Sequence, residues 1–463
     1  MQQNYENTSI RISALIITTL ASFLLPFMIS SVNIALPAIA KDFNMSAITM
    51  GWVVTSYILS AAVFLVPFGR IADIYGRKRI FVAGMLVYTL ASFLLTISNS
   101  SIMLIISRIL QGLGGSMNYG TAVAILTSIY PPNQRGKVLG INVSAVYLGL
   151  SVGPTIGGIL TQAFGWRSIF AINVPIGLAI SIASIFILKG EWAGAKGEKF
   201  DLAGSIIFAG MLVALMHGFS RITTTAGILE TSIGIVLFVI FVLWESKSKY
   251  PILDVKLFKG NKTFTLSNLA ALINYSATWA VTFLLSLYLQ YIKVLSPRDA
   301  GLVLLAQPIV QAVLSPFSGR MSDYIEPRIV ASIGMGATAF GLILFSFIDS
   351  GTSIYYLIIL LVISGFGFAL FSAPNMSAIM GSVEKKYYGV ASGMVGTMRM
   401  TGQMMSMGIV MLIFTLYIGG AKITPENYDQ FLLSAKMAFK VFSILCILGM
   451  LASLSRGKIR QEN

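Results

Sequence analysis

The chain has 463 residues, of which 56% are hydrophobic and only 11% are charged, and its mean hydropathy is +0.83. Soluble domains carry about 25% charged residues, so this composition excludes a soluble globular protein. The net charge of +15 is compatible with nucleic-acid binding, but in a membrane protein the same excess belongs to cytoplasmic loops, which is our interpretation. A single cysteine, Cys446, excludes an intrachain disulfide.

Apolar runs of about 20 residues recur along the chain, and each is long enough as a helix to cross the hydrocarbon core of a bilayer. Helices are expected because every backbone group must be hydrogen-bonded within lipid. The expected spans are 13–40, 49–68, 79–98, 101–124, 138–161, 168–188, 201–219, 226–245, 263–291, 299–318, 327–348, 354–378, 387–418 and 434–455. The sequence therefore predicts an all-α polytopic membrane protein with fourteen transmembrane helices.

The distribution of Lys and Arg predicts the orientation of these spans. If the N-terminus is cytoplasmic, 22 of the 32 basic residues fall in cytoplasmic segments and eight fall outside. The remaining two, Arg108 and Arg399, lie within spans. This bias predicts that both termini are cytoplasmic, and an even number of spans agrees with it.

An internal repeat divides the chain. The segment GRIADIYGRKR at 69–79 and the segment GRMSDYIEPRI at 319–329 each follow an expected span. With a shift of 250 residues, the aligned pairs are Gly69 with Gly319, Arg70 with Arg320 and Asp73 with Asp323. Such repeats are typical of transporters built from two helix bundles. We expect six-helix bundles at 1–188 and 263–463, and a central insert of two transmembrane helices with cytoplasmic linkers at 189–262.

Several segments resemble motifs of one family. Residues 69–79, called the signature loop below, resemble the signature loop of the major facilitator superfamily. The segment GLSVGPTIGG at 149–158 resembles its antiporter motif, and SRILQGLGGSMN at 107–118 resembles its fourth-helix motif. With fourteen spans, the whole chain resembles the fourteen-helix drug–proton antiporters of the EmrB/QacA group. The resemblance implies the major facilitator fold, a plasma-membrane location and multidrug-type efflux of small amphipathic compounds by alternating access, by default with proton antiport.

The resemblance also implies gating roles. The signature loop would latch the cytoplasmic side in one state, and the antiporter motif would seal the pathway. From the residues alone, glycines at helical spacing let a neighbouring helix approach closely, and simple packing remains the alternative. The implied gating residues are Gly69, Arg70, Asp73, Gly76, Arg77, Arg79, Gly149, Gly153, Pro154, Gly157, Gly158, Gly319 and Asp323.

Polar side chains within the spans predict a cavity. An arginine inside a span is costly unless it faces water or a partner, so Arg108 and Arg399 are functional candidates, with snorkelling to an interface as the alternative. The expected cavity residues are Asn33, Tyr57, Arg108, Gln111, Asn118, Tyr119, Asn274, Tyr275, Gln307, Gln311, Arg399 and Gln403. For each of the amides and phenols, hydrogen bonding between helices is the alternative. Tyr147 is a further polar group within a span.

The expected acid is missing. When the first span is aligned with the resembled family, the family's aspartate falls on Met28, and none of the 17 acidic residues lies in the middle of a span. Arginine does not deprotonate in proteins, so a proton relay would depend on rim residues such as Asp42 or Asp73. Two arginines without partners favour an anionic or neutral amphiphile. The alternatives are an exchanger or uniporter without proton coupling for an anionic metabolite or lipid-like compound, and a receptor or scaffold that does not transport.

The sequence contains no Ser/His/Asp set, no metal-ligand cluster and no nucleotide-binding loop. We therefore expect no enzyme activity, no cofactor, no metal and no ATP drive. The expected partners are the lipid bilayer, a small amphipathic substrate and, by default, protons, but not nucleic acid, and the protein is expected to be a monomer. The central helix pair is expected to be a lipid-facing addition.

Overall fold

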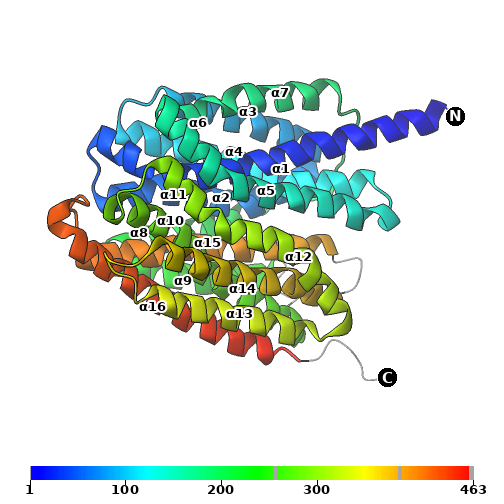
Figure 1. The fold of residues 1–463 in the computed structure, drawn as a ribbon. Coiled ribbons are helices and arrows are strands. Elements are labelled where there is room, and N and C mark those ends of the chain that lie inside the picture. Colours follow the sequence, from blue (N-terminus) through cyan, green and yellow to red (C-terminus); the bar gives the residue numbers. More distant parts are fainter. Residues whose placement is uncertain (1, 254–257, 384–387, 458–463) are drawn as a thin grey trace.

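The computed structural model describes residues 2–253, 258–383 and 388–457, and these ranges contain helices and no strand (Figure 1). The first half contains α1 (Gln2–Phe43), α2 (Ala47–Tyr75), α3 (Arg77–Thr96), α4 (Ser101–Ile129), α5 (Pro132–Phe164), α6 (Ser168–Ala171) and α7 (Asn173–Phe186). A central hairpin follows, made of α8 (Leu202–Ser220) and α9 (Thr225–Lys247). The second half contains α10 (Lys262–Leu287), a π-helical turn (Tyr288–Ile292), α11 (Pro297–Leu304), α12 (Ala306–Tyr324), α13 (Pro327–Phe345), α14 (Ile354–Gly381), α15 (Tyr388–Tyr417) and α16 (Tyr428–Leu454).

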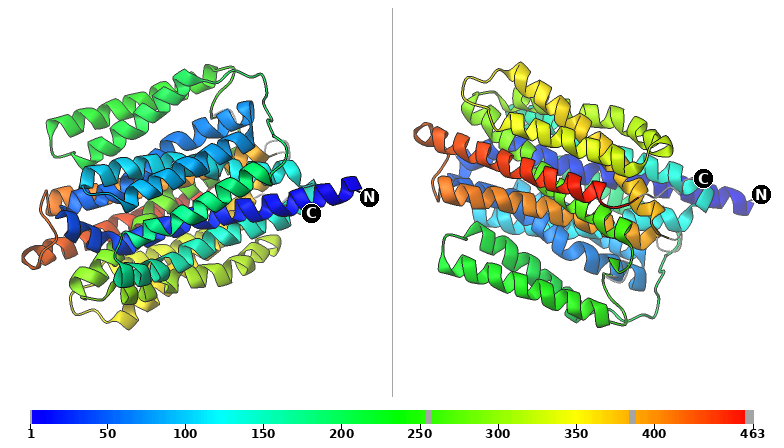
Figure 2. Two further views of the ribbon diagram at one scale, coloured as in Figure 1. Left: turned by 90° about the horizontal axis from the view of Figure 1, so that it is seen from above. Right: turned by 90° about the horizontal axis from the view of Figure 1, so that it is seen from below.

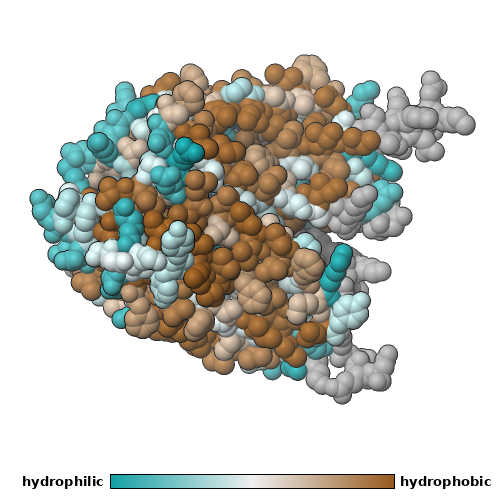
Figure 3. All heavy atoms as spheres, in the orientation of Figure 1, coloured by the Kyte–Doolittle hydropathy of each residue, from teal (hydrophilic) through white to brown (hydrophobic). Residues whose placement is uncertain are grey.

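The described part of the chain contains 13 helical stretches that are long and apolar enough to cross a membrane. The more polar α4 is not among them, but its 29 residues pack along both α2 and α3, so it crosses beside them as the fourteenth. An apolar band covers the middle of the molecule in Figure 3, and hydrophilic side chains gather at its ends. The prediction of an all-α polytopic membrane protein is confirmed.

Two expected spans are interrupted. The span expected at 168–188 is divided between α6 and α7 at Ile172, and the span expected at 299–318 is divided between α11 and α12 at Leu305. In each case a proline, Pro175 or Pro308, is the third residue of the second helix. Proline has no N–H and its ring crowds the preceding turn, which explains why the helix breaks there. Each pair still makes one membrane crossing.

The helix pairings of the first half recur in the second half. In the first half, α1 packs on α5, α2 and α3 pack on α4, and α3 packs on α7. In the second half, α10 packs on α15, α12 and α13 pack on α14, and α13 packs on α16. This correspondence follows the repeat seen at residues 69–79 and 319–329. Two seams join the halves, one where α2 meets α15 and one where α5 meets α11 and α12.

The ends of the chain and the hairpin have distinct positions. α1 begins and α16 ends at the same end of the molecule, which we call the terminal end (Figure 1). The hairpin of α8 and α9 lies along one flank, and both views of Figure 2 show it at the edge of the bundle. The division into domains at 1–188, 189–262 and 263–463 stays a prediction.

Candidate transport cavity and gates

A cavity lies between the two halves. The empty space within it, with the open mouth included, is about 1040 Å³. The walls come from α1, α4 and α5 on one side and from α10, α11, α12, α14 and α15 on the other. The lining residues are Pro26, Ile29, Ser30, Asn33, Tyr119, Val146, Tyr147, Leu150, Pro154, Tyr275, Thr278, Trp279, Thr282, Leu304, Gln307, Pro308, Gln311, Phe368, Arg399, Met400 and Gln403.

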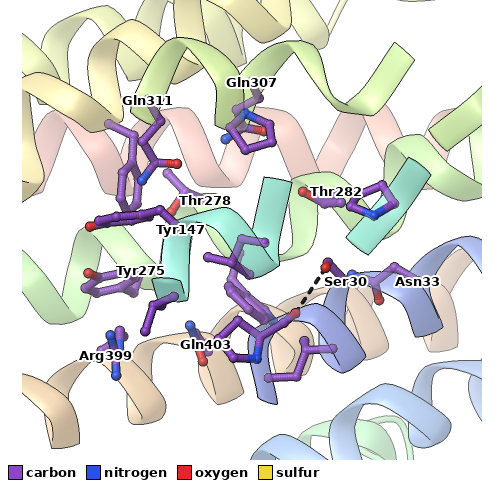
Figure 4. A pocket seen from close by; sticks show the side chains of 18 of the residues that line it. Ser30, Asn33, Tyr147, Tyr275, Thr278, Thr282, Gln307, Gln311, Arg399 and Gln403 are labelled. Atoms are coloured by element: carbon purple, nitrogen blue, oxygen red, sulfur yellow. Dashed lines mark hydrogen bonds between the residues drawn. The ribbon is translucent and has the colours of Figure 1, made fainter. Parts of the chain in front are cut away.

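The cavity brings together seven of the twelve side chains expected there. These are Asn33, Tyr119, Tyr275, Gln307, Gln311, Arg399 and Gln403. Figure 4 shows the two glutamines of α12 on one wall, opposite Arg399 and Gln403 of α15. The lining also includes Ser30, Thr278 and Thr282, whose small hydroxyl groups give no distinctive signal in the sequence. Tyr147 lines the same space, and its hydroxyl lies 3.0 Å from Ser372 Oγ across the halves.

Arg399 carries the only charge that the described residues contribute to the lining. Its guanidinium lies 5.8 Å from the ring centre of Tyr119, a cation–π distance. Its Nε has no hydrogen-bond partner, and no carboxylate of the described residues forms an ion pair with it. The cavity therefore presents a positive charge among aromatic faces and amides.

Arg108 lies outside the cavity lining, within the first half. Its Nε donates to the carbonyl oxygen of Val53 at 3.0 Å, and its Nη1 donates to Gln111 Oε1 at 2.5 Å. Its guanidinium stacks over the Tyr57 ring at 4.4 Å, and Gln111 in turn donates to Ser92 Oγ at 3.0 Å. Arg108 is completely buried, and these contacts link α4 to α2 and α3.

The remaining expected cavity residues also lie outside the lining. Tyr57 and Gln111 belong to the Arg108 cluster, and Asn118 donates to the carbonyl oxygen of Gly114, one turn earlier on α4, at 2.8 Å. Asn274 is completely buried, and neither polar atom of its side chain has a hydrogen-bond partner. Their assignment as cavity residues stays a prediction.

The two halves touch closely at the end remote from the termini. Ser286 Oγ donates to the carbonyl oxygen of Asn33 at 2.6 Å, and Gln290 Nε2 donates to that of Ile34 at 3.0 Å. A Cβ atom at Gly158 would lie 2.4 Å from the Pro297 carbonyl oxygen, which is closer than non-bonded contact allows. We call these contacts, at the end remote from the termini, the outer seal.

The other members of the antiporter motif join α5 to α1 and α11. A Cβ at Gly149 would lie 2.4 Å from the Phe23 carbonyl oxygen, and Gly153 and Gly157 approach α1 as closely at Ser30 and Ser31. The carbonyl oxygen of Pro154 lies 2.3 Å from where a Cβ of Gly301 on α11 would be. The glycine face therefore packs within the first half for most of its length and reaches the second half only at its outer end.

The signature loop is held within its own half and by the linker to α8. Arg77 donates through Nε to Asp73 Oδ1 at 2.8 Å and through Nη1 to the carbonyl oxygen of Ala124 at 3.1 Å. Arg70 forms an ion pair with Glu198 of the linker, and Arg79 lies 3.6 Å from Glu191.

The glycines of the repeated loop differ in their surroundings. Gly76 has a φ of +121°, a conformation that side chains with a Cβ rarely adopt. A Cβ at Gly69 would meet nothing within 4 Å, and one at Gly319 would only touch Ala373 at 3.8 Å. The side chain of Asp323 is outside the described residues.

Met28, at the position of the family's acid, does not line the cavity. Its side chain is fully buried, and Asn173 Nδ2 lies 3.0 Å from its sulfur. The position therefore faces α7 inside the first half.

Fourteen membrane-competent helices, with a cavity between two repeated halves and close contacts at one end, form the architecture of a multi-pass membrane transporter. The sequence profile described as Major Facilitator Superfamily matches residues 18–245 and 268–461. The chain belongs to this family and is therefore a membrane transporter and not an enzyme.

Two characterised relatives and one solved structure are similar to it. A riboflavin transporter of Clostridioides difficile, RibZ, is 29% identical, with 92% of this chain and 93% of that protein covered. A multidrug resistance protein of Mycobacterium tuberculosis, Stp, is 28% identical, with 89% and 77% covered. The crystal structure of a bacterial homologue of the human lysosomal transporter Spinster, inward-facing and unoccupied, aligns with a TM-score of 0.71 at 14% identity, with 97% of each chain covered.

Proposed function

We propose that this transporter exports small amphipathic compounds by alternating access, as a member of the fourteen-helix EmrB/QacA group, and that its substrates are neutral or anionic. The observation that carries the proposal is Arg399, a guanidinium in a cavity to which the described residues contribute no carboxylate. A cationic compound in the cavity would be repelled by Arg399 and would find no carboxylate among the described lining residues to balance its charge. A carboxylate or phosphate would form a charge-assisted hydrogen bond with it.

The other walls of the cavity favour a planar substrate with polar edges. Tyr119, Tyr275 and Trp279 offer aromatic faces, and Gln307 and Gln311 offer both donors and acceptors. The names of the two relatives agree with this chemistry, since one is a riboflavin transporter and the other a multidrug resistance protein. Riboflavin is a planar neutral heterocycle, and its 5′-phosphate has the same ring with an anionic group.

These two fluorescent flavins test the proposal in proteoliposomes that contain the purified protein. A charge-assisted hydrogen bond contributes about 1.5–3 kcal/mol, so we expect Arg399→Gln to raise the KM for riboflavin 5′-phosphate by about tenfold to hundredfold. The KM for riboflavin should change by less than about threefold, and Arg399→Lys should retain part of the difference because it keeps the charge.

The matched control is Arg221→Gln, which removes an exposed guanidinium in the hairpin loop. If Arg399→Gln leaves the transport of every anionic amphiphile unchanged, or if only cationic dyes are transported, the proposed substrate class is wrong.

We infer proton antiport from the resemblance alone, and the coupling group would lie outside the cavity lining. Asp42 pairs with Arg167 at 2.8 Å near the outer seal, and Asp73 pairs with Arg77 at the terminal end. A pH gradient imposed on the proteoliposomes, with and without a protonophore, tests this inference. Transport that follows the gradient and is lost in Asp42→Asn or Asp73→Asn supports it, and transport indifferent to the gradient in the unmodified protein contradicts it.

We further infer that both termini are cytoplasmic, so that the end opposite the outer seal faces the cytoplasm, and that the protein works as a monomer. The excess of Lys and Arg at the terminal end supports the orientation. The repeated pairing of helices supports domain boundaries near 188 and 262.

A further inference from the structure

The central hairpin contacts both halves of the transporter. α8 packs against α2 of the first half and α15 of the second, so it covers the seam where these two helices meet. On the α2 side, the ring of His217 lies 6.1 Å from that of Trp52. On the α15 side, Thr415 Oγ1 donates to the carbonyl oxygen of Ser220 at 3.1 Å, and Gly408 leaves room for Met216. This helix is therefore more than a lipid-facing addition.

The linker between α7 and α8 crosses the signature loop. The carboxylate of Glu191 accepts from the backbone N–H groups of Lys78 at 2.8 Å and Arg79 at 3.3 Å, in the first turn of α3. An acidic group at this position satisfies N–H groups that have no partner in the helix and complements its dipole. The carboxyl carbon of Glu191 lies only 2.4 Å from where a Cβ of Gly76 would be, so the cap depends on a glycine in the loop.

The linker also forms backbone hydrogen bonds with the loop. Arg77 N donates to the carbonyl oxygen of Trp192, and Ala195 N donates to that of Asp73, both at 2.9 Å. Glu198 completes the contact through its ion pair with Arg70. Residues 191–198 thus contact the loop from its start to the beginning of α3. Among the described residues, the hydrogen-bond and ion-pair partners of Arg70, Asp73 and Arg77 all belong to the first half or to the linker.

The linker and α8 thus form one continuous segment that contacts the signature loop, α2 and α15. The linker holds the signature loop at the terminal end, and α8 contacts α2 and α15 beside the seam. When the halves rock about the cavity, α2 and α15 change their relative position, and α8 must slide on at least one of them. Because only residues 199–201 separate Glu198 from the start of α8, such a displacement is transmitted to the signature loop.

We propose that the linker and α8 act as a strap that stabilises the state sealed at the end remote from the termini. In this proposal, Glu191 and Glu198 are positioning residues that hold the signature loop in that state. The proposal is independent of the substrate and of the coupling ion, so its test measures access to the cavity and not transport.

The test uses a single reporter cysteine in the full chain. Thr282→Cys lies in the cavity lining, and Cys446→Ser removes the native thiol. A membrane-impermeant maleimide is applied to either side of oriented vesicles, and the ratio of the two labelling rates reports the balance of the two states. Glu191→Gln and Glu198→Gln each weaken a charge-assisted contact, so we expect each to shift the ratio by about threefold to tenfold toward the side remote from the termini.

The matched control is Glu426→Gln in the loop before α16, where the carboxylate accepts a hydrogen bond from Thr424. The proposal is overturned if neither glutamate variant shifts the ratio, or if the control shifts it equally. Insertion of Gly-Ser-Gly-Ser after Lys199 keeps the contacts of Glu191 and Glu198 but lengthens the strap. This variant tests the proposal if a glutamate variant fails to fold. If the linker and α8 act as a strap, the insertion should shift the ratio of labelling rates in the same direction as the glutamate variants. An unchanged ratio would refute the transmission of movement through the linker.

Discussion

The outer seal offers a direct perturbation, because Gly158 of α5 contacts the backbone of the second half. A Cβ added there would lie 2.4 Å from the Pro297 carbonyl oxygen, about 1 Å inside ordinary contact. Relieving such overpacking against backbone costs about 1–3 kcal/mol. We therefore expect Gly158→Ala to lower the population of the sealed state by about fivefold to hundredfold relative to the open one.

Gly140→Ala provides the control on the same helix, since a Cβ at Gly140 would meet nothing within 4 Å. Both substitutions raise the helix propensity of α5 by the same amount, about 1 kcal/mol. The difference in labelling between the two variants therefore reports the effect on the outer seal. The Thr282→Cys reporter should be labelled faster from the side remote from the termini in Gly158→Ala than in Gly140→Ala. Equal labelling of the two variants would refute the assignment of Gly158 to the seal.

Two further outcomes follow from buried polar geometry. Met28→Asp places an acid at a completely buried position beside Asn173. Because the charged form of the carboxyl group is costly there, we expect the Tm to fall more at pH 8 than at pH 5. An equal loss of Tm at both pH values would show that the site is hydrated. Asp201 caps α8 by accepting a hydrogen bond from Gly204 N at 2.8 Å, and it also accepts from the side chains of Trp244 and Ser248 at the end of α9. Asp201→Asn should lower the stability of the hairpin by about 1–3 kcal/mol and raise hydrogen exchange in residues 202–247. The control Glu230→Gln, at the opposite end of the hairpin, should not raise exchange near Asp201.

The helical spans could be predicted from sequence because a membrane demands long apolar runs, and that demand is local. The breaks at Ile172 and Leu305 were missed although Pro175 and Pro308 were visible. Proline is tolerated within several other helices of this chain, among them α1, which contains Pro26 and Pro37. Whether a proline kinks a helix or divides it depends on neighbouring helices that satisfy the freed carbonyls, which the sequence does not specify.

The two intramembrane arginines show which part of the site could not be predicted from the sequence. Arg108 and Tyr119 are 11 residues apart, which is about three turns, so they lie on nearly the same face of α4 and about 16 Å apart along it. Tyr119 reaches the cavity, whereas Arg108 lies at the level of Val53 and Tyr57, where α2 covers that face. Helical periodicity gives the face of a side chain, but the depth at which a neighbouring helix covers that face is a tertiary property.

The hairpin makes the two seams between the halves unequal. The repeated pairing relates the seam of α2 and α15 to the seam of α5 with α11 and α12, yet α8 covers only the first. The second seam contains Gly158 and Gly301, whose contacts with the opposing backbone separate without breaking an ion pair. Separation at the first seam must also displace α8 and, through the linker, the signature loop. These added contacts resist separation of the first seam, and in our proposal the central helices favour the state in which the glycine seam is closed.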